Sequence, residues 1–156
     1  MKKRLIVSLV IGCILLLLAY FQPYKLVVVV GQSMYPTYKS GQILLAKKTQ
    51  NFNKSDAVVA IADDGTLIVK RILYIPEEYY YYVMKKEGYY ELIIDNSYRS
   101  ILQTKNIDDA YMMELKVPKN HYYLIGDNLD KSDDSRRFGT LDENEILYKI
   151  VQWILN

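Results

Sequence analysis

The chain has 156 residues, enough for one domain, or for one domain with a small insertion. Its formal net charge of +2 is too small to indicate nucleic-acid binding. Its single cysteine, Cys13, excludes an intrachain disulfide, and its single histidine, His121, excludes a histidine-rich metal site. We therefore expect no nucleic-acid partner, no metal and no cofactor.

The N-terminal segment is basic and then apolar. Lys2, Lys3 and Arg4 precede an uncharged run from Leu5 to Phe21, which would form a helix of about 25 Å and just span a bilayer. The basic flank predicts a cytoplasmic N-terminus and an extracytoplasmic remainder. Residues 1–24 are predicted to be a single-pass anchor in the plasma membrane, in contact with lipid, and residues 25–156 an extracytoplasmic domain.

Two other interpretations of this segment stay open. A cleaved secretory signal peptide has the same basic start, and Cys13 lies where a lipoprotein signal would carry its lipid. Against both, the apolar run is long and continues past Cys13, and no small-x-small site follows it before Pro23.

The rest of the chain is rich in short β-type runs separated by turn signals. Asp63-Asp64-Gly65 is a typical hairpin turn between two of them. The predicted strands are 26–30, 43–46, 57–62, 66–74, 79–84, 89–95 and 121–125. Residues 107–115 are ambiguous, and residues 141–155 fit a helix or a strand. The expected fold class is mainly β, an antiparallel sheet with an insertion at about 75–117.

Two residues stand out as a candidate nucleophile and its base. Ser33 directly follows the first predicted strand, and a serine hydroxyl needs a neighbouring base to become reactive. His121 would be the usual base, but its surroundings favour an ordinary histidine at a strand end. Lys70 lies within an apolar strand, where burial would favour the neutral amine that a base requires. From the strand alone, an exposed lysine on a polar face is the more common outcome.

Three blocks of sequence together resemble the type I signal peptidase family, the bacterial leader peptidases with a Ser/Lys dyad. The resemblance covers nearly the whole chain, from the apolar N-terminus to about Gly139. The blocks are Gly31-Gln32-Ser33-Met34-Tyr35-Pro36-Thr37, Lys70-Arg71, and Gly126-Asp127-Asn128 with Ser132, Asp134, Ser135, Arg136 and Gly139.

The resemblance implies a role for each matching residue. Ser33 matches the nucleophile and Lys70 the general base. Ser132 matches the serine that hydrogen-bonds the lysine amine. Asp127, Asp134 and Arg136 match residues that brace the site, which predicts ion pairs involving Arg71. The backbone N–H of Ser33 is the expected oxyanion donor, and Gly31 stands where some members have a second, hydroxyl donor.

The same resemblance implies a substrate class. The partners would be exported pre-proteins, cut just outside the membrane after a small-x-small site. The substrate would bind as an extended strand beside 26–32 and 67–69. Residues expected to contact it are Val27, Val29, Gly31, Met34, Ile68 and Val69. Each apolar member of this set is equally compatible with an ordinary core position.

Three alternative functions differ in what the apolar segment and the dyad would do. A self-cleaving repressor also uses a Ser/Lys dyad, but it is soluble, which the run 5–21 opposes. A conjugation-type processing peptidase shares both the anchor and the dyad. A non-catalytic binding module tethered to the membrane would not require Ser33 and Lys70, and both are present.

Overall fold

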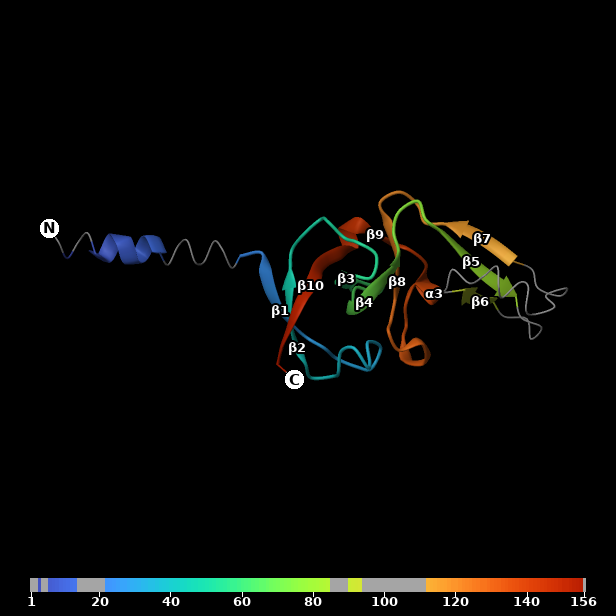
Figure 1. The fold of residues 1–156 in the computed structure, drawn as a ribbon, viewed down its shortest axis with the longest axis horizontal. Helices are drawn as coiled ribbons and strands as arrows, with labels where there is room; N and C mark the ends of the chain where they lie inside the picture. Colours follow the sequence, from blue (N-terminus) through green and yellow to red (C-terminus); the bar gives the residue numbers. More distant parts are fainter. Residues whose placement is uncertain (1–2, 4–5, 14–21, 85–89, 94–111, 156) are drawn as a thin grey trace.

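The fold is described from a computed structural model, which describes all residues except 1–2, 4–5, 14–21, 85–89, 94–111 and 156. Its strands form two antiparallel sheets (Figure 1). The strands are β1 (Tyr24–Val28), β2 (Ile43–Lys47), β3 (Ala57–Ile61), β4 (Leu67–Tyr74), β5 (Tyr79–Met84), β6 (Tyr90–Ile93), β7 (Met112–Lys116), β8 (His121–Ile125), β9 (Leu141–Asp142) and β10 (Ile146–Leu155). The short helices are η1 (Leu129–Lys131), α3 (Ser135–Phe138) and η2 (Glu143–Glu145). The predicted mainly β, antiparallel class is confirmed.

The larger sheet has seven strands in the order β1-β2-β10-β3-β4-β8-β9. The predicted strands at 43–46, 57–62, 66–74 and 121–125 lie within a residue of β2, β3, β4 and β8. The first strand begins and ends two residues earlier than predicted. The hairpin between β3 and β4 turns at Gly65, whose φ of +81° is readily adopted by glycine alone.

The C-terminal segment, compatible with helix or strand by its sequence, forms the strands β9 and β10 around η2. Strand β10 pairs with both β2 and β3, and its register shifts on each side. It therefore joins the first hairpin of the chain to the second and completes the sheet that carries Ser33 and Lys70.

Strand β3 is apolar on both sides, and this places it at the centre of the core. Val58 and Ala60 belong to one buried cluster, together with Ile72 and Leu124 from β4 and β8. Ala57 and Val59 alternate with them and pack into a second cluster that contains Val29 and Leu44. Because successive side chains of a strand point to opposite faces, the sheet is buried on both faces here.

The smaller sheet, in the order β6-β5-β7, lies at the end of the molecule opposite β1 (Figure 1). It falls within 75–117, the range predicted as an insertion. Tyr80 packs against Tyr74 and Tyr123 of the larger sheet, with ring centroids 5.7 and 4.8 Å apart. The hydroxyls of Tyr82 and Tyr123 lie 2.6 Å apart. An aromatic cluster thus joins the two sheets.

Residues 6–13 are helical, and most of the remaining predicted anchor lies outside the described residues. Within the part of the chain that the structure describes, no helix reaches the length and apolar character that crossing a membrane requires. The strand prediction at 89–95 also extends beyond the described residues, which assign β6 to Tyr90–Ile93.

Candidate active site

Ser33 lies in a tight turn that follows β1. The turn is closed by hydrogen bonds from the Tyr35 N–H to the Gln32 carbonyl, 3.1 Å, and from the Tyr38 N–H to the Met34 carbonyl, 2.8 Å. The Asn128 N–H donates to the Ser33 carbonyl at 2.9 Å. The third sequence block is therefore docked directly onto the turn that carries Ser33.

Gly126 makes this docking possible. A Cβ atom at this position would lie 2.1 Å from Ser132 Oγ and 2.6 Å from the Ser33 carbonyl oxygen. Both distances are far below van der Waals contact, so any side chain would push the two segments apart. The glycine brings the chain around Ser132 against the chain around Ser33.

Lys70 lies in the middle of β4, opposite Val58 of β3, and is only 3% exposed. It shares the face of the strand with Ile68 and Ile72, because alternate residues point the same way. No carboxylate of the described residues forms an ion pair with it. Burial lowers the pKa of Lys70 below its ordinary value, against the opposing influence of the Asp134 and Asp133 charges.

Ser132 follows η1 and presents a buried hydroxyl. Its Oγ makes no well-formed hydrogen bond with any described residue, although it lies near enough to the Asp134 carboxylate to favour the charge there. A buried hydroxyl without a partner is uncommon and usually has a functional or solvent-related reason.

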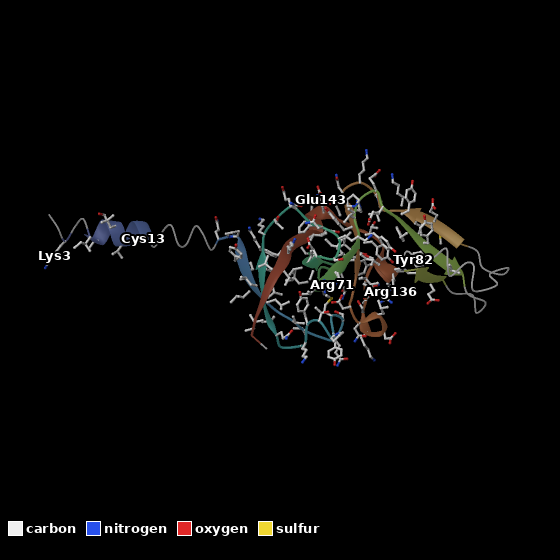
Figure 2. The ribbon with its side chains drawn as sticks, viewed as in Figure 1. Lys3, Cys13, Arg71, Tyr82, Arg136 and Glu143 are labelled. Atoms are coloured by element: carbon white, nitrogen blue, oxygen red, sulfur yellow. The ribbon has the colours of Figure 1, made fainter. Side chains whose placement is uncertain are left out.

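Arg71, the neighbour of Lys70, is fully engaged in a bidentate ion pair. Its Nε and Nη2 donate to the two Asp127 carboxylate oxygens at 2.7 and 2.6 Å, and its Nη1 donates to the Ser55 carbonyl at 2.7 Å. Arg136 forms a second, separate pair, donating from Nε and Nη2 to Asp134 at 2.8 and 2.9 Å. Figure 2 labels both arginines. The predicted pairing with Arg71 therefore involves Asp127 alone, while Asp134 is held by Arg136.

Asp134 is completely buried and ties the third block together. It accepts the Gly126 N–H at 3.0 Å and the Arg136 N–H at 3.2 Å. Burial opposes its charge, but the hydrogen bonds from Arg136 and Gly126 outweigh this cost and hold the pKa of Asp134 below its ordinary value. The carboxylate is thus fixed in its charged form beside Ser132.

An apolar groove of about 600 Å³ runs past Ser33 and Lys70. Most of the predicted substrate-contact residues line it, namely Val27, Val29, Met34, Ile68 and Val69. Met34 and Val29 are almost entirely buried, so they form its floor. Gly31 lines a second cavity instead, of about 280 Å³, which also reaches Ser33 and Lys70.

Two strand edges face this groove. Strand β1 is the edge of the larger sheet and pairs only with β2. On β4, pairing with β8 begins at Arg71, so the edge of 67–70 on that side carries no strand among the described residues. An extended peptide therefore has backbone groups available on both walls of the groove.

The backbone N–H of Ser33 is available to donate a hydrogen bond to a ligand. The Ser33 N–H makes no hydrogen bond within the described part of the chain, whereas the Gly31 N–H donates to Ser40 Oγ at 3.3 Å. His121 lines neither cavity; its Nδ1 lies 3.0 Å from the Lys119 carbonyl oxygen. Within the described residues, no group of three His, Cys, Asp or Glu side chains is placed to hold a metal.

Sequence reasoning missed three residues of the site's framework. These are Gly126 and Asn128, whose contacts with Ser33 are given above, and Ser135, whose Oγ accepts the Leu124 N–H at 2.9 Å. All three stand in the quoted third block, but their roles depend on contacts between distant segments.

Comparisons with known proteins place the sequence in a family. The family model described as "Signal peptidase, peptidase S26" matches residues 2–154. Signal peptidase IB of Staphylococcus aureus (strain Mu50) is 29% identical, over 96% of this chain and 89% of its own length. Signal peptidase I V of Bacillus subtilis (strain 168) is 30% identical, over 94% of this chain and 96% of its own length.

A crystal structure of a signal peptidase I from Enterococcus faecalis V583 aligns with 65% of this chain and 97% of its own, at 19% identity and a TM-score of 0.43. The sequence matches extend over nearly the whole chain. The chain therefore belongs to the signal peptidase family, peptidase S26, and is a hydrolase that removes signal peptides.

Proposed function

We propose that the chain cuts exported pre-proteins after a small-x-small site, with Ser33 as nucleophile and neutral Lys70 as general base. The observation that carries the proposal is the environment of Lys70. It is buried, has no ion-pair partner among the described residues, and lines the same groove as Ser33. A lysine in such a site favours the neutral amine, which can accept a proton.

The reaction proceeds in two proton-balanced halves. Ser33 Oγ attacks the scissile carbonyl while its proton passes to Lys70 Nζ, and the tetrahedral oxyanion accepts a hydrogen bond from the Ser33 N–H. Lys70 then gives that proton to the departing amine, which leaves an acyl-enzyme. A water molecule repeats the sequence, releasing the signal peptide and restoring the Ser33 hydroxyl and the neutral amine.

Ser132 orients the base in this proposal. Its buried hydroxyl has no well-formed hydrogen bond to a described residue and is held beside the charged Asp134 carboxylate. A hydrogen bond between this hydroxyl and the Lys70 amine would fix the amine for attack. The Arg71–Asp127 and Arg136–Asp134 pairs brace the turn and the third block without taking part in proton transfer.

The substrate binds as an added strand between the two open edges of β1 and β4. Main-chain hydrogen bonds supply affinity, and alternate side chains enter the apolar groove. The buried floor made by Val29 and Met34 leaves room for small side chains, which supports a preference for alanine at the first and third positions before the cut. Gly31 permits close approach of the substrate backbone.

The proposal includes the arrangement at the membrane. Residues 1–24 act as a single-pass anchor with a cytoplasmic N-terminus, and residues 25–156 form the extracytoplasmic peptidase domain with its insertion at 75–117. The basic flank and the uncharged run from Leu5 support this topology. No metal or cofactor is required by this chemistry.

The test is direct cleavage. The purified full chain in detergent is incubated with a pre-protein that carries an Ala-x-Ala site, and the new N-terminus of the product is sequenced. We expect one cut directly after the second alanine, absent with Ser33→Ala protein. Cleavage elsewhere, or undiminished cleavage by the Ser33→Ala variant, would contradict the proposal.

A further inference from the structure

We propose that the second cavity, on the far side of Ser33, receives the first residues after the cleaved bond, and that Lys131 gives it a preference for acidic residues there. This inference rests on the proposed function, because only a peptidase that cuts at Ser33 has substrate residues on that side.

The two cavities share the reacting groups in their linings. Ser33, Ile68 and Lys70 line both of them. An extended substrate whose scissile carbonyl lies at Ser33 would then place residues on either side of the cut in different cavities. The apolar groove suits the apolar end of a signal peptide, which leaves the second cavity for the chain that follows the cut.

The second cavity has a different character, because the β3–β4 turn and the third block close around it. Its lining includes the charged residues Asp64, Lys131, Asp133 and Arg137, together with Lys70. The cavity of about 280 Å³ is large enough for a few side chains of an extended peptide. It therefore suits the polar start of a mature exported protein.

Most charges in this cavity already have partners within the protein. Asp133 and Arg137, four residues apart in the sequence, form an ion pair. Asp64 accepts hydrogen bonds from the Thr66 N–H and Oγ1, at 2.9 and 2.7 Å. The exposed ammonium of Lys131 has no ion pair with any residue that the structure describes.

Lys131 is thus the cation that an incoming carboxylate meets without displacing an internal partner. A lysine in the substrate would meet like charge at the same place. Ion pairs between exposed groups are weak, so a total preference of about three- to tenfold for the acidic over the basic segment is expected, and salt should reduce it.

The experiment uses three matched peptides that differ only at the second and third positions after the cut, which carry Glu-Glu, Gln-Gln or Lys-Lys. The ratio of kcat/KM for the Glu-Glu and Lys-Lys peptides is measured with wild type, Lys131→Gln and Lys131→Glu at pH 8. Lys119→Glu is the control, since it makes the same change of charge at an exposed residue outside both cavities.

We expect a wild-type ratio of about 3 to 10, a ratio of about 1 or somewhat below for Lys131→Gln, where the Asp64 charge remains, a more strongly inverted ratio for Lys131→Glu, and a wild-type ratio for Lys119→Glu. A wild-type ratio of about 1 would overturn the assigned role of Lys131, and so would a ratio that Lys119→Glu changes as much as Lys131→Glu does. In both cases, cleavage of the Gln-Gln peptide would still support the proposed function. Failure of the wild type to cut any of the three peptides would instead refute the proposed function, and this inference with it.

Discussion

Lys70 and Arg71 are neighbours on β4, and the two faces of that strand hold their charges in different ways. On one face, Lys70 is buried and forms no ion pair with any described residue. On the other, Arg71 is held by two hydrogen bonds to Asp127 and one to the Ser55 carbonyl. The pKa of Lys70 is lowered by burial, and the pKa of Arg71 is raised, chiefly by its hydrogen bonds to Asp127.

In the proposed mechanism, this difference lets one strand serve both chemistry and structure. A buried amine without an ion-pair partner is costly, and in the proposed mechanism that cost makes Lys70 available as a base. The paired guanidinium connects β4 to the third block through Asp127, and so holds the Gly126–Ser132 segment against the turn of Ser33. The same separation explains why Asp134 needs its own partner, Arg136, rather than sharing Arg71.

The largest expected effect comes from removing either member of the dyad. Ser33→Ala and Lys70→Ala should each lower single-turnover cleavage by at least about 1,000-fold, and the double variant should be no worse, because the two groups act as one unit. Lys70→Arg should be equally inactive, since arginine stays charged in proteins.

Lys119→Ala is the matched control for these variants, because it removes an exposed lysine away from both cavities. It should keep wild-type activity. Near-native cleavage by Lys70→Arg would show that catalysis does not need a neutral side chain at position 70. It would contradict the distinction between a neutral Lys70 and a charged, paired Arg71.

A smaller effect is expected at Ser132. Ser132→Ala should reduce single-turnover cleavage by about 10- to 100-fold, the order of one lost hydrogen bond to a catalytic group. Ser132→Thr keeps the hydroxyl and should recover part of the rate. If Ser132→Ala cleaves as fast as wild type, its buried hydroxyl has no part in orienting Lys70.

The smallest expected effect is on the free energy of unfolding, where substitutions of Lys70 and Arg71 should act in opposite directions. Lys70→Met should raise the free energy of unfolding at pH 7, because it removes the cost of burying the amine. Arg71→Met should lower it by about 2 kcal/mol, because Asp127 loses its charged partner. Urea unfolding of both variants and wild type measures the two changes. Equal losses in both variants would contradict the account.

The stability that Lys70→Met gains over wild type should depend on pH in a predictable direction. Because the folded-state pKa of Lys70 is depressed, the unfolded chain binds more protons between the folded pKa and the ordinary value of about 10.4. Wild-type stability from this group therefore rises with pH through that window. The excess stability of Lys70→Met over wild type should therefore shrink between pH 7 and pH 10, by about 1.4 kcal/mol for each pH unit that lies within this window.

Much of the sheet could be predicted because the relevant signals are local. Strands β2, β3 and β4 have β-branched or apolar runs bounded by turn residues, and their limits follow from these. Residues 141–155 lack such a local signal. Their conformation is decided by pairing of β10 with β2 and β3, partners far away in the sequence.

The candidate site, too, could be predicted only where its signals are local in the sequence. Ser33, Lys70 and the third block could be selected by residue type and family pattern, but not the details of their contacts. The need for glycine at 126 arises only when Ser132 and the Ser33 carbonyl approach it from two directions. The division into an Arg71–Asp127 pair and an Arg136–Asp134 pair likewise depends on how β4 and α3 are placed.

If neutral Lys70 is the base, the dependence of kcat/KM on pH should reveal its titration. Only neutral Lys70 can accept the Ser33 proton, so the rate should rise with pH through an apparent pKa below the ordinary lysine value, a value that belongs to the coupled site. Wild type and His121→Ala, assayed side by side on one peptide, should give the same profile and remain active at pH 8–9. A rising limb near pH 6.5 that disappears in His121→Ala would make histidine the base and contradict the account.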